Sequence, residues 1–202
     1  MVACALGCEA DFARTDPGAV PSLFRRLDAG GVYERARARD ALVALGPMVV
    51  PGLRARLASS ESGLRLQAAR ALASIQPRPL DALAEALASP DMRVREEVSA
   101  ALVDAGSEAL PAFEPALTAP DHNVREDALA TLGRFGLEAL PWIDRSLGDA
   151  DPRVRQAAVR ALGAIGAPAR PRLEELAESS DQGVRRGARE VLRSLDVRPA
   201  RS

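Results

Sequence analysis

Apolar and polar positions repeat every thirty residues along this chain of 202 residues. If the sequence is divided after residue 20 into thirty-residue segments, the third, seventh and twenty-second positions are apolar in every segment, with no insertion or gap. A fixed period of this length predicts a tandem array of one structural unit. The predicted array covers residues 21–197, in the segments 21–50, 51–80, 81–110, 111–140, 141–170 and 171–197.

Each segment contains two helical patterns. The first begins at a Pro in five segments, which suits the first turn of a helix, and carries apolar residues at positions three and seven. Except at Glu34 and Thr131, the second carries apolar residues at positions 14, 18, 21, 22 and 25, which form one stripe of a helix about 14 residues long. Asp is a favoured N-cap, and Gly ends helices at positive φ. These signals are Asp91, Asp121, Asp151 and Asp181 at position 11, and Gly46, Gly106, Gly136 and Gly166 at position 26.

Helix pairs in tandem, without strand-like alternation, predict an all-α fold. Each pair buries its apolar stripe against its neighbours, so the expected architecture is an α-solenoid of six thirty-residue helix-turn-helix repeats. Residues 1–20 match no repeat and are predicted to form an N-terminal extension or cap, with 198–202 as a C-terminal tail.

The residues of the second helical pattern resemble a known repeat family. The run DPRVRQAAVRALGAIG at 151–166 resembles HEAT-like repeats of the short type first recognised in phycobilisome lyases. DHNVREDALATLGRFG at 121–136 follows the same pattern, and residues 91–106 follow it more loosely. The resemblance covers residues 21–195 and implies the fold, whereas it implies no single function.

Arg stands at position 15 of every segment, and in four of the six segments it follows an Asp at position 11 by four residues. The resemblance implies that each Arg reaches an Asp or a backbone carbonyl in an adjacent repeat and fixes the register by charge-assisted hydrogen bonds. Catalysis needs different residues at one site, so we expect this ladder to be architectural. Since Gly31 replaces the Asp in the first segment, Arg35 is expected to stabilise the stack less than Arg125 does. The predicted structural ladder is Asp91, Arg95, Asp121, Arg125, Asp151, Arg155, Asp181 and Arg185.

The charge and the hydropathy of the chain limit the classes of partner that we expect. The 27 basic residues, all Arg, balance 28 acidic residues, and the net charge of −1 argues against tracking a phosphate backbone or an anionic membrane. No apolar stretch is long enough to span a bilayer. We therefore expect protein partners, no nucleic acid, no transmembrane segment and a cytoplasmic monomer.

Catalytic and metal signals are weak. His122 is the only His, and a metal site based on it would need further His or Cys ligands. HEAT-like deoxyhypusine hydroxylases carry His-Glu pairs, whereas Asn123 follows His122 here. HEAT-like DNA glycosylases use a basic groove lined with aromatic residues, and this chain has one Trp and no excess positive charge. We expect no enzyme activity, no catalytic residues, no cofactor and no metal. Trp142 either anchors a partner or covers the join between two first helices.

Cys4 and Cys8 are the only Cys residues. Ala5-Leu6-Gly7-Cys8 resembles the end of a bacterial lipoprotein signal, although only seven residues precede Cys8 and none is basic. A lipoprotein anchored through Cys8 is therefore an alternative only if the true start lies upstream of Met1.

The favoured function is a non-enzymatic protein–protein interaction scaffold or adaptor. In HEAT-like solenoids the second helices line the concave side, so the partner is expected on their outward positions 16, 20 and 23, where small residues would let it approach the backbone. The alternative is a bilin-lyase-like enzyme or chromophore chaperone. The predicted partner-binding residues are Glu96, Ala100, Val103, Glu126, Ala130, Gly133, Gln156, Arg160, Gly163, Arg186 and Arg193.

Overall fold

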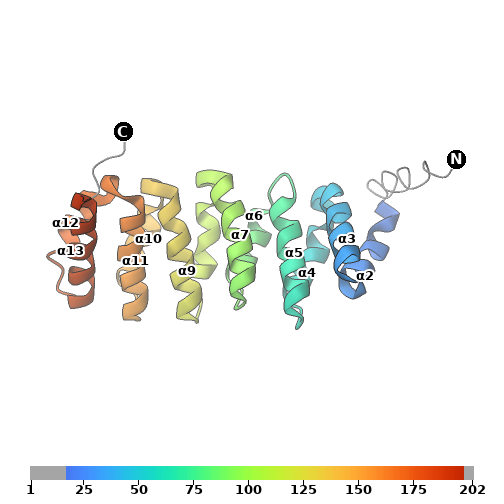
Figure 1. Cartoon of the computed structure of the whole chain (residues 1–202), viewed down its shortest axis with the longest axis horizontal. Coiled ribbons are helices and arrows are strands. Elements are labelled where there is room, and N and C mark those ends of the chain that lie inside the picture. Colours follow the sequence, from blue (N-terminus) through green and yellow to red (C-terminus); the bar gives the residue numbers. More distant parts are fainter. Residues whose placement is uncertain (1–16, 198–202) are drawn as a thin grey trace. The chain divides into compact units, whose positions relative to one another are not determined.

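The computed structural model describes residues 17–197, and within this range every regular element is a helix (Figure 1). The predictions for Cys4 and Cys8 and for the tail at 198–202 lie outside the described residues. The α-helices are α2 Val20–Ala29, α3 Val32–Ala44, α4 Val50–Leu57, α5 Ser62–Ser74, α6 Leu80–Leu87, α7 Met92–Ala105, α8 Glu114–Leu117, α9 His122–Leu132, α10 Leu140–Ser146, α11 Pro152–Ile165, α12 Arg170–Leu176 and α13 Gln182–Val197. The 3-10 helices are η1 Pro17–Ala19, η2 Gly46–Val49, η3 Gly106–Phe113, η4 Gly133–Ala139 and η5 Ala167–Ala169.

The chain divides into two compact units at a boundary inside α7, between Leu102 and Val103. Unit 1 comprises the described residues up to 102, and unit 2 those from 103 onward. In both units, short first helices alternate with longer ones, which we call the second helices: α3, α5, α7, α9, α11 and α13. In unit 1, α3 packs against α5, and in unit 2, α11 packs against both α9 and α13. Second helix thus stacks on second helix, as an all-α solenoid requires.

The predicted starts and ends of the helices are confirmed. The side chain of Asp121 accepts a hydrogen bond from the backbone N–H of Asn123, and Asp151 accepts one from Arg153. At the other end, the four Gly residues of position 26 have φ between 67° and 84°. Because side chains with a Cβ rarely adopt positive φ, the Gly at this position terminates the second helix and turns the chain toward the next repeat.

The fourth repeat departs from the expected pattern. Its first helical segment is mostly the 3-10 helix η3, followed by the four-residue α8. Pro111 lies inside η3 and Pro115 at the start of α8, so two backbone N–H donors are missing from this short stretch. The second helix α9 is also short, with 11 residues, because the chain changes to 3-10 geometry at Gly133.

The core is made by the predicted apolar columns. The Leu of position 22 is 0% exposed at 42, 72, 102, 132 and 162. In the last repeat the corresponding Leu192 is half-buried, since no further described helix covers it. Unit 2 adds one aromatic contact, in which the rings of Phe113 and Phe135 meet edge to face with centroids 5.4 Å apart.

Candidate functional site: a ladder at the helix starts and a groove on the second helices

The Arg of position 15 clamps the loop between the two helices of its own repeat. Nη1 of Arg125 donates to the carbonyls of Ala119 and Pro120 at 2.7 and 3.1 Å. Nη1 of Arg155 donates in the same way to Asp149 and Ala150, at 2.8 and 3.0 Å. These carbonyls follow the first helix, so the guanidinium satisfies groups that helix ends leave unpaired. The Arg side chains therefore do bind backbone carbonyls, as predicted, but these carbonyls belong to the same repeat and not to an adjacent one.

For Arg35, Arg65, Arg125 and Arg155, the acidic partner comes from the following repeat. Arg65 pairs with Asp91 at 2.6 Å, and Arg155 pairs with Asp181 at 2.9 Å. Arg125 uses Asp149, at 2.9 Å, in place of the expected Asp151. Arg95, only 4% exposed, donates to the carbonyl of Ser89 at 2.8 Å. The ladder thus links neighbouring repeats, and each of these ion pairs joins the Arg of one repeat to an acid of the repeat that follows it in the sequence.

Because the acid comes from the next repeat, the expectation that Arg35 lacks an acidic partner is wrong. Gly31 does not deprive Arg35 of an acid, because Arg35 pairs with Glu61 of the next repeat at 2.6 Å and also donates to the carbonyl of Gly30 at 2.8 Å. The weak end of the ladder is instead Arg185, which holds the carbonyls of Ser179 and Ser180 and has no acidic partner among residues 17–197.

Arg125→Ala should lower the free energy of unfolding by about 1.5–3 kcal/mol, because it removes charged hydrogen bonds to a half-buried loop and to Asp149. Arg134→Ala is the matched control, since Arg134 is exposed, and it should change stability by about 0.5 kcal/mol or less. Urea unfolding of both variants checks this. If Arg125→Ala lost a binding activity while keeping full stability, the ladder would be functional and not architectural.

The pKa of Asp91 is lowered from its usual 3.8, first by the hydrogen bond from Ser62 Oγ at 2.7 Å and then by the guanidinium of Arg65. The pKa of Asp181 is also lowered, first by the hydrogen bond from the backbone N–H of Val184 and then by Arg155. Both carboxylates are therefore held ionised in the folded protein.

Because the folded pKa of Asp91 lies below the unfolded value, its contribution to stability is present above pH 3.8 and is lost as the pH falls through the folded pKa. Asp91→Asn should thus be less stable than the wild type at neutral pH, and the gap should close in acid. Unfolding curves between about pH 7 and pH 3 measure this difference, with Asp81→Asn, an exposed site in the same unit, as control. A gap of constant size at every pH would contradict the assignment.

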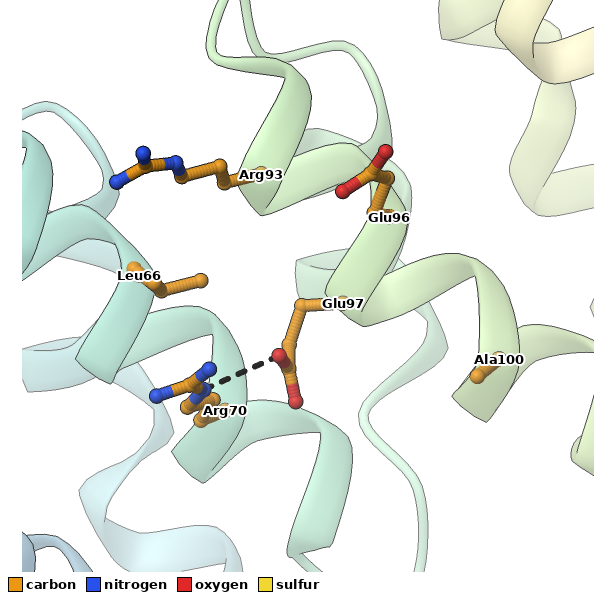
Figure 2. A pocket seen from close by; sticks show the side chains of 6 residues that line it. All are labelled: Leu66, Arg70, Arg93, Glu96, Glu97 and Ala100. Carbon is orange, nitrogen blue, oxygen red and sulfur yellow. Dashed lines mark hydrogen bonds and ion pairs between the residues drawn. The ribbon is translucent and has the colours of Figure 1, made fainter.

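A groove lies between α5 and α7 on the face of the second helices in unit 1 (Figure 2). Its volume is about 470 Å³. α5 contributes Leu66 and Arg70, one turn apart, and α7 contributes residues spaced three or four apart along one face. The lining residues are Leu66, Arg70, Arg93, Glu96, Glu97 and Ala100.

Two of the four charged side chains in this groove form an ion pair with each other, and the other two do not. Arg70 Nε and Glu97 Oε2 form an ion pair at 3.1 Å that joins α5 to α7. Arg93 and Glu96 are exposed, and neither side chain has a partner among residues 17–197. In Figure 2, Arg93 extends from α7 toward the side of Leu66, whereas the carboxylate of Glu96 points away from the Arg70–Glu97 pair. Among the described residues, the groove therefore offers one unpaired cation and one unpaired anion, with Leu66 on its α5 side and Ala100 on its α7 side.

Two of the predicted partner-binding residues have a different role. Gly133 is buried, and a Cβ there would meet the backbone oxygen of Ala161 at 2.9 Å. Gly163 is half-buried, and a Cβ there would meet Cγ1 of Val191 at 2.9 Å. The prediction that these Gly residues open the backbone to a partner is wrong, because they let neighbouring second helices of unit 2 approach each other closely.

Two charged residues of the predicted partner-binding set are paired with each other. Glu126 and Arg160 form an ion pair at 3.0 Å between α9 and α11, so they are not presented as separate charges. Ala130, Arg186 and Arg193 are exposed, whereas Val103 and Gln156 are half-buried. Two other predicted partner-binding residues, Glu96 and Ala100, line the groove of unit 1.

His122 and Trp142 are both half-buried side chains of unit 2. Nε2 of His122 lies 3.0 Å from Nη1 of Arg153 and accepts its hydrogen bond, because a guanidinium only donates. The ring is half-buried at the start of α9. Trp142 is half-buried in α10. Within residues 17–197 no three His, Cys, Asp or Glu side chains are grouped so as to hold a metal ion.

Sequence reasoning missed four lining residues of the groove: Leu66, Arg70, Arg93 and Glu97. Arg93 stands three residues before Glu96, on the same helix face, so helical spacing was a usable signal. The ion pair between Arg70 and Glu97 depends on how two helices are stacked, which spacing within one helix does not determine.

Stacked second helices, loops held by Arg side chains and ion pairs from four of these Arg residues to an acid of the next repeat define an α-solenoid. The family model of HEAT repeats matches residues 50–133 and 110–193. The chain therefore belongs to the HEAT-repeat family. No curated protein matches the sequence significantly.

Solved structures of several repeat proteins are similar to this chain. Human deoxyhypusine hydroxylase in complex with glycerol is 22% identical, with a TM-score of 0.49 over 94% of this chain and 80% of that one. The complex of CpcE and CpcF of phycocyanin lyase from Nostoc sp. PCC7120 is 27% identical, with a TM-score of 0.42 over 88% of this chain and 99% of that one. Computationally designed armadillo repeat proteins for modular peptide recognition are 17% identical, with a TM-score of 0.40 over 87% and 99%.

Proposed function

We propose that this protein is a non-enzymatic scaffold or adaptor that binds a protein segment along the face of its second helices, with the groove between α5 and α7 as a principal contact. The observation that carries the proposal is the pair of exposed charges, Arg93 and Glu96, which have no partner among residues 17–197 and line the same groove as Leu66 and Ala100. Comparable charges on the same face, Arg70 with Glu97 and Glu126 with Arg160, are already paired.

The chemistry of the groove favours a segment with one apolar side chain between an acidic and a basic residue. The apolar side chain would contact Leu66, while the acidic residue faces Arg93 and the basic residue faces Glu96. Exposed ion pairs contribute little affinity, so these charges would mainly fix the orientation and the choice of the partner. No helix within residues 17–197 is long and apolar enough to cross a membrane.

Charge reversal tests the proposal. Arg93→Glu and Glu96→Arg, used as affinity baits in the native host, should each reduce recovery of the partner about tenfold relative to the wild type. Arg25→Glu is the matched control for Arg93→Glu, since Arg25 is exposed on α2 and its reversal makes the same change of net charge outside the groove. The affinity of the purified partner for all four proteins then gives the effect directly. Equal affinities for the wild type and both groove variants would refute the proposal.

The alternative of a bilin-lyase-like enzyme or chromophore chaperone stays a prediction, as do the cytoplasmic location and the monomeric state. Co-expression with a phycobiliprotein and its chromophore tests the alternative, and a coloured covalent adduct formed only in the presence of this protein would favour it over the scaffold.

A further inference from the structure

Two side-chain contacts join the second helices α9 and α11 in unit 2. Nε2 of His122 on α9 accepts a hydrogen bond from Nη1 of Arg153 on α11 at 3.0 Å. Further along the same helices, Glu126 and Arg160 form an ion pair at 3.0 Å. The first contact joins position 12 of one repeat to position 13 of the next, and the second joins position 16 to position 20.

The groove between α5 and α7 in unit 1 lies at the same positions of the repeat. The residues at positions 12 and 16 of α5 and at positions 13 and 20 of α7 are Ser62, Leu66, Arg93 and Ala100. Two apolar side chains replace the ion pair at positions 16 and 20, and a Ser replaces the His at position 12. The groove therefore corresponds to a face that unit 2 closes with its own side chains.

Arg93 is placed like Arg153, but its guanidinium has no acceptor among residues 17–197. The backbone N–H of Arg93 donates to Oδ1 of Asp91 at 3.1 Å, as that of Arg153 donates to Asp151 at 2.8 Å. The difference lies at position 12, where Oγ of Ser62 donates to Oδ2 of Asp91 at 2.7 Å. Because Ser is shorter than His and its hydroxyl is engaged by Asp91, α5 supplies no counterpart of the imidazole that binds Arg153.

We propose that the first turn of α5, at Ser62, is the subsite for the acidic residue of the partner segment, whose carboxylate binds Arg93. This carboxylate takes the place that the imidazole of His122 has beside Arg153 in unit 2. A guanidinium binds a carboxylate through two parallel charge-assisted hydrogen bonds, so a carboxylate fits Arg93 better than a neutral acceptor does. The subsite belongs to the groove of the proposed function and depends on it.

The neighbouring side chains fit this assignment. Asp91 does not compete for the guanidinium of Arg93, because its carboxylate accepts from Ser62 and, at 2.6 Å, from Arg65. Arg93 extends toward the side of Leu66 (Figure 2), which lies one turn after Ser62 on the same face of α5. An acid bound at the subsite therefore brings the next residue of the segment to Leu66, and the short side chain of Ser62 determines that an acid is accepted.

Two blocked peptides test the subsite in the full chain. One contains Glu, Leu and Arg in succession, the other contains Gln, Leu and Arg, and NMR titration at pH 8 gives their affinities. The Glu peptide should bind the wild type about fivefold more tightly than the Gln peptide, a ratio typical of one exposed ion pair. With Arg93→Gln, which keeps a polar side chain but removes the charge, the ratio should fall to about one.

Ser62→His separates the subsite from the charge of Arg93. The introduced imidazole, neutral at pH 8, should accept from Arg93 as His122 accepts from Arg153, so the ratio should fall to about one although Arg93 is unchanged. Ser62→Ala is the matched control, because it removes the hydroxyl without lengthening the side chain, and it should keep the ratio at about fivefold. Circular dichroism spectra like that of the wild type check that both variants are folded.

Equal affinities of the wild type for the two peptides, or no binding of either, would overturn the subsite. A ratio that persists with Ser62→His, or is lost with Ser62→Ala, would overturn it as well. In each case the proposed function stands if Arg93→Glu and Glu96→Arg weaken binding of the native partner, and it fails with the subsite if they do not.

Discussion

Phe113→Ala should lower the free energy of unfolding of unit 2 by about 3–5 kcal/mol. Phe113 is 0% exposed, and its ring meets that of Phe135 edge to face, with an angle of 84° between the planes. Truncation removes the largest fully buried side chain of the described core and leaves a cavity beside an unpartnered ring. Urea unfolding followed by fluorescence or circular dichroism measures the loss.

The repeat supplies the control for this prediction. The same position holds Leu in the repeats that contain Leu23, Leu53, Leu83 and Leu173. Phe113→Leu should therefore fold normally and lose much less stability than Phe113→Ala. If the two variants were equally unstable, the position would depend on the aromatic contact with Phe135 and not on filled volume.

Leu132→Ala should lower the free energy of unfolding by about 2–5 kcal/mol, because Leu132 lies fully buried among stacked second helices. Leu192 occupies the same column in the last repeat but is half-buried, so Leu192→Ala should cost less. Leu195→Ala, also at a half-buried site on α13, should behave like Leu192→Ala. Equal losses at Leu132 and at the two end positions would contradict the stacked arrangement.

The fold could be predicted because the same local signals recur in most repeats. Apolar residues at the spacing of one helix face, Asp before the second helix and Gly after it all act within a few residues of one another. The Gly residues of position 26 show this, since their positive φ follows from the need to end one helix and begin the next.

The contacts between repeats were harder to predict because they depend on the stacking geometry. Gly133 and Gly163 look like openings on an outward face, yet both lie where a neighbouring helix approaches the backbone. Arg35 seemed to lack an acid because Gly31 stands four residues before it, whereas its acid, Glu61, comes from the next repeat. Spacing within a helix shows which residues share a face and leaves open what that face meets.

The central claim, that the groove between α5 and α7 binds a protein partner, is tested most directly by site-specific photo-crosslinking. A benzoylphenylalanine at Ala100, which is exposed in the groove, should form an adduct with one protein in the native host. The yield should fall about tenfold when Glu96→Arg is added. The same probe at Met48, 54% exposed in the same unit but outside the groove, should give no such adduct. The absence of an adduct at Ala100, or an adduct of equal yield at both positions and unaffected by Glu96→Arg, would contradict the account.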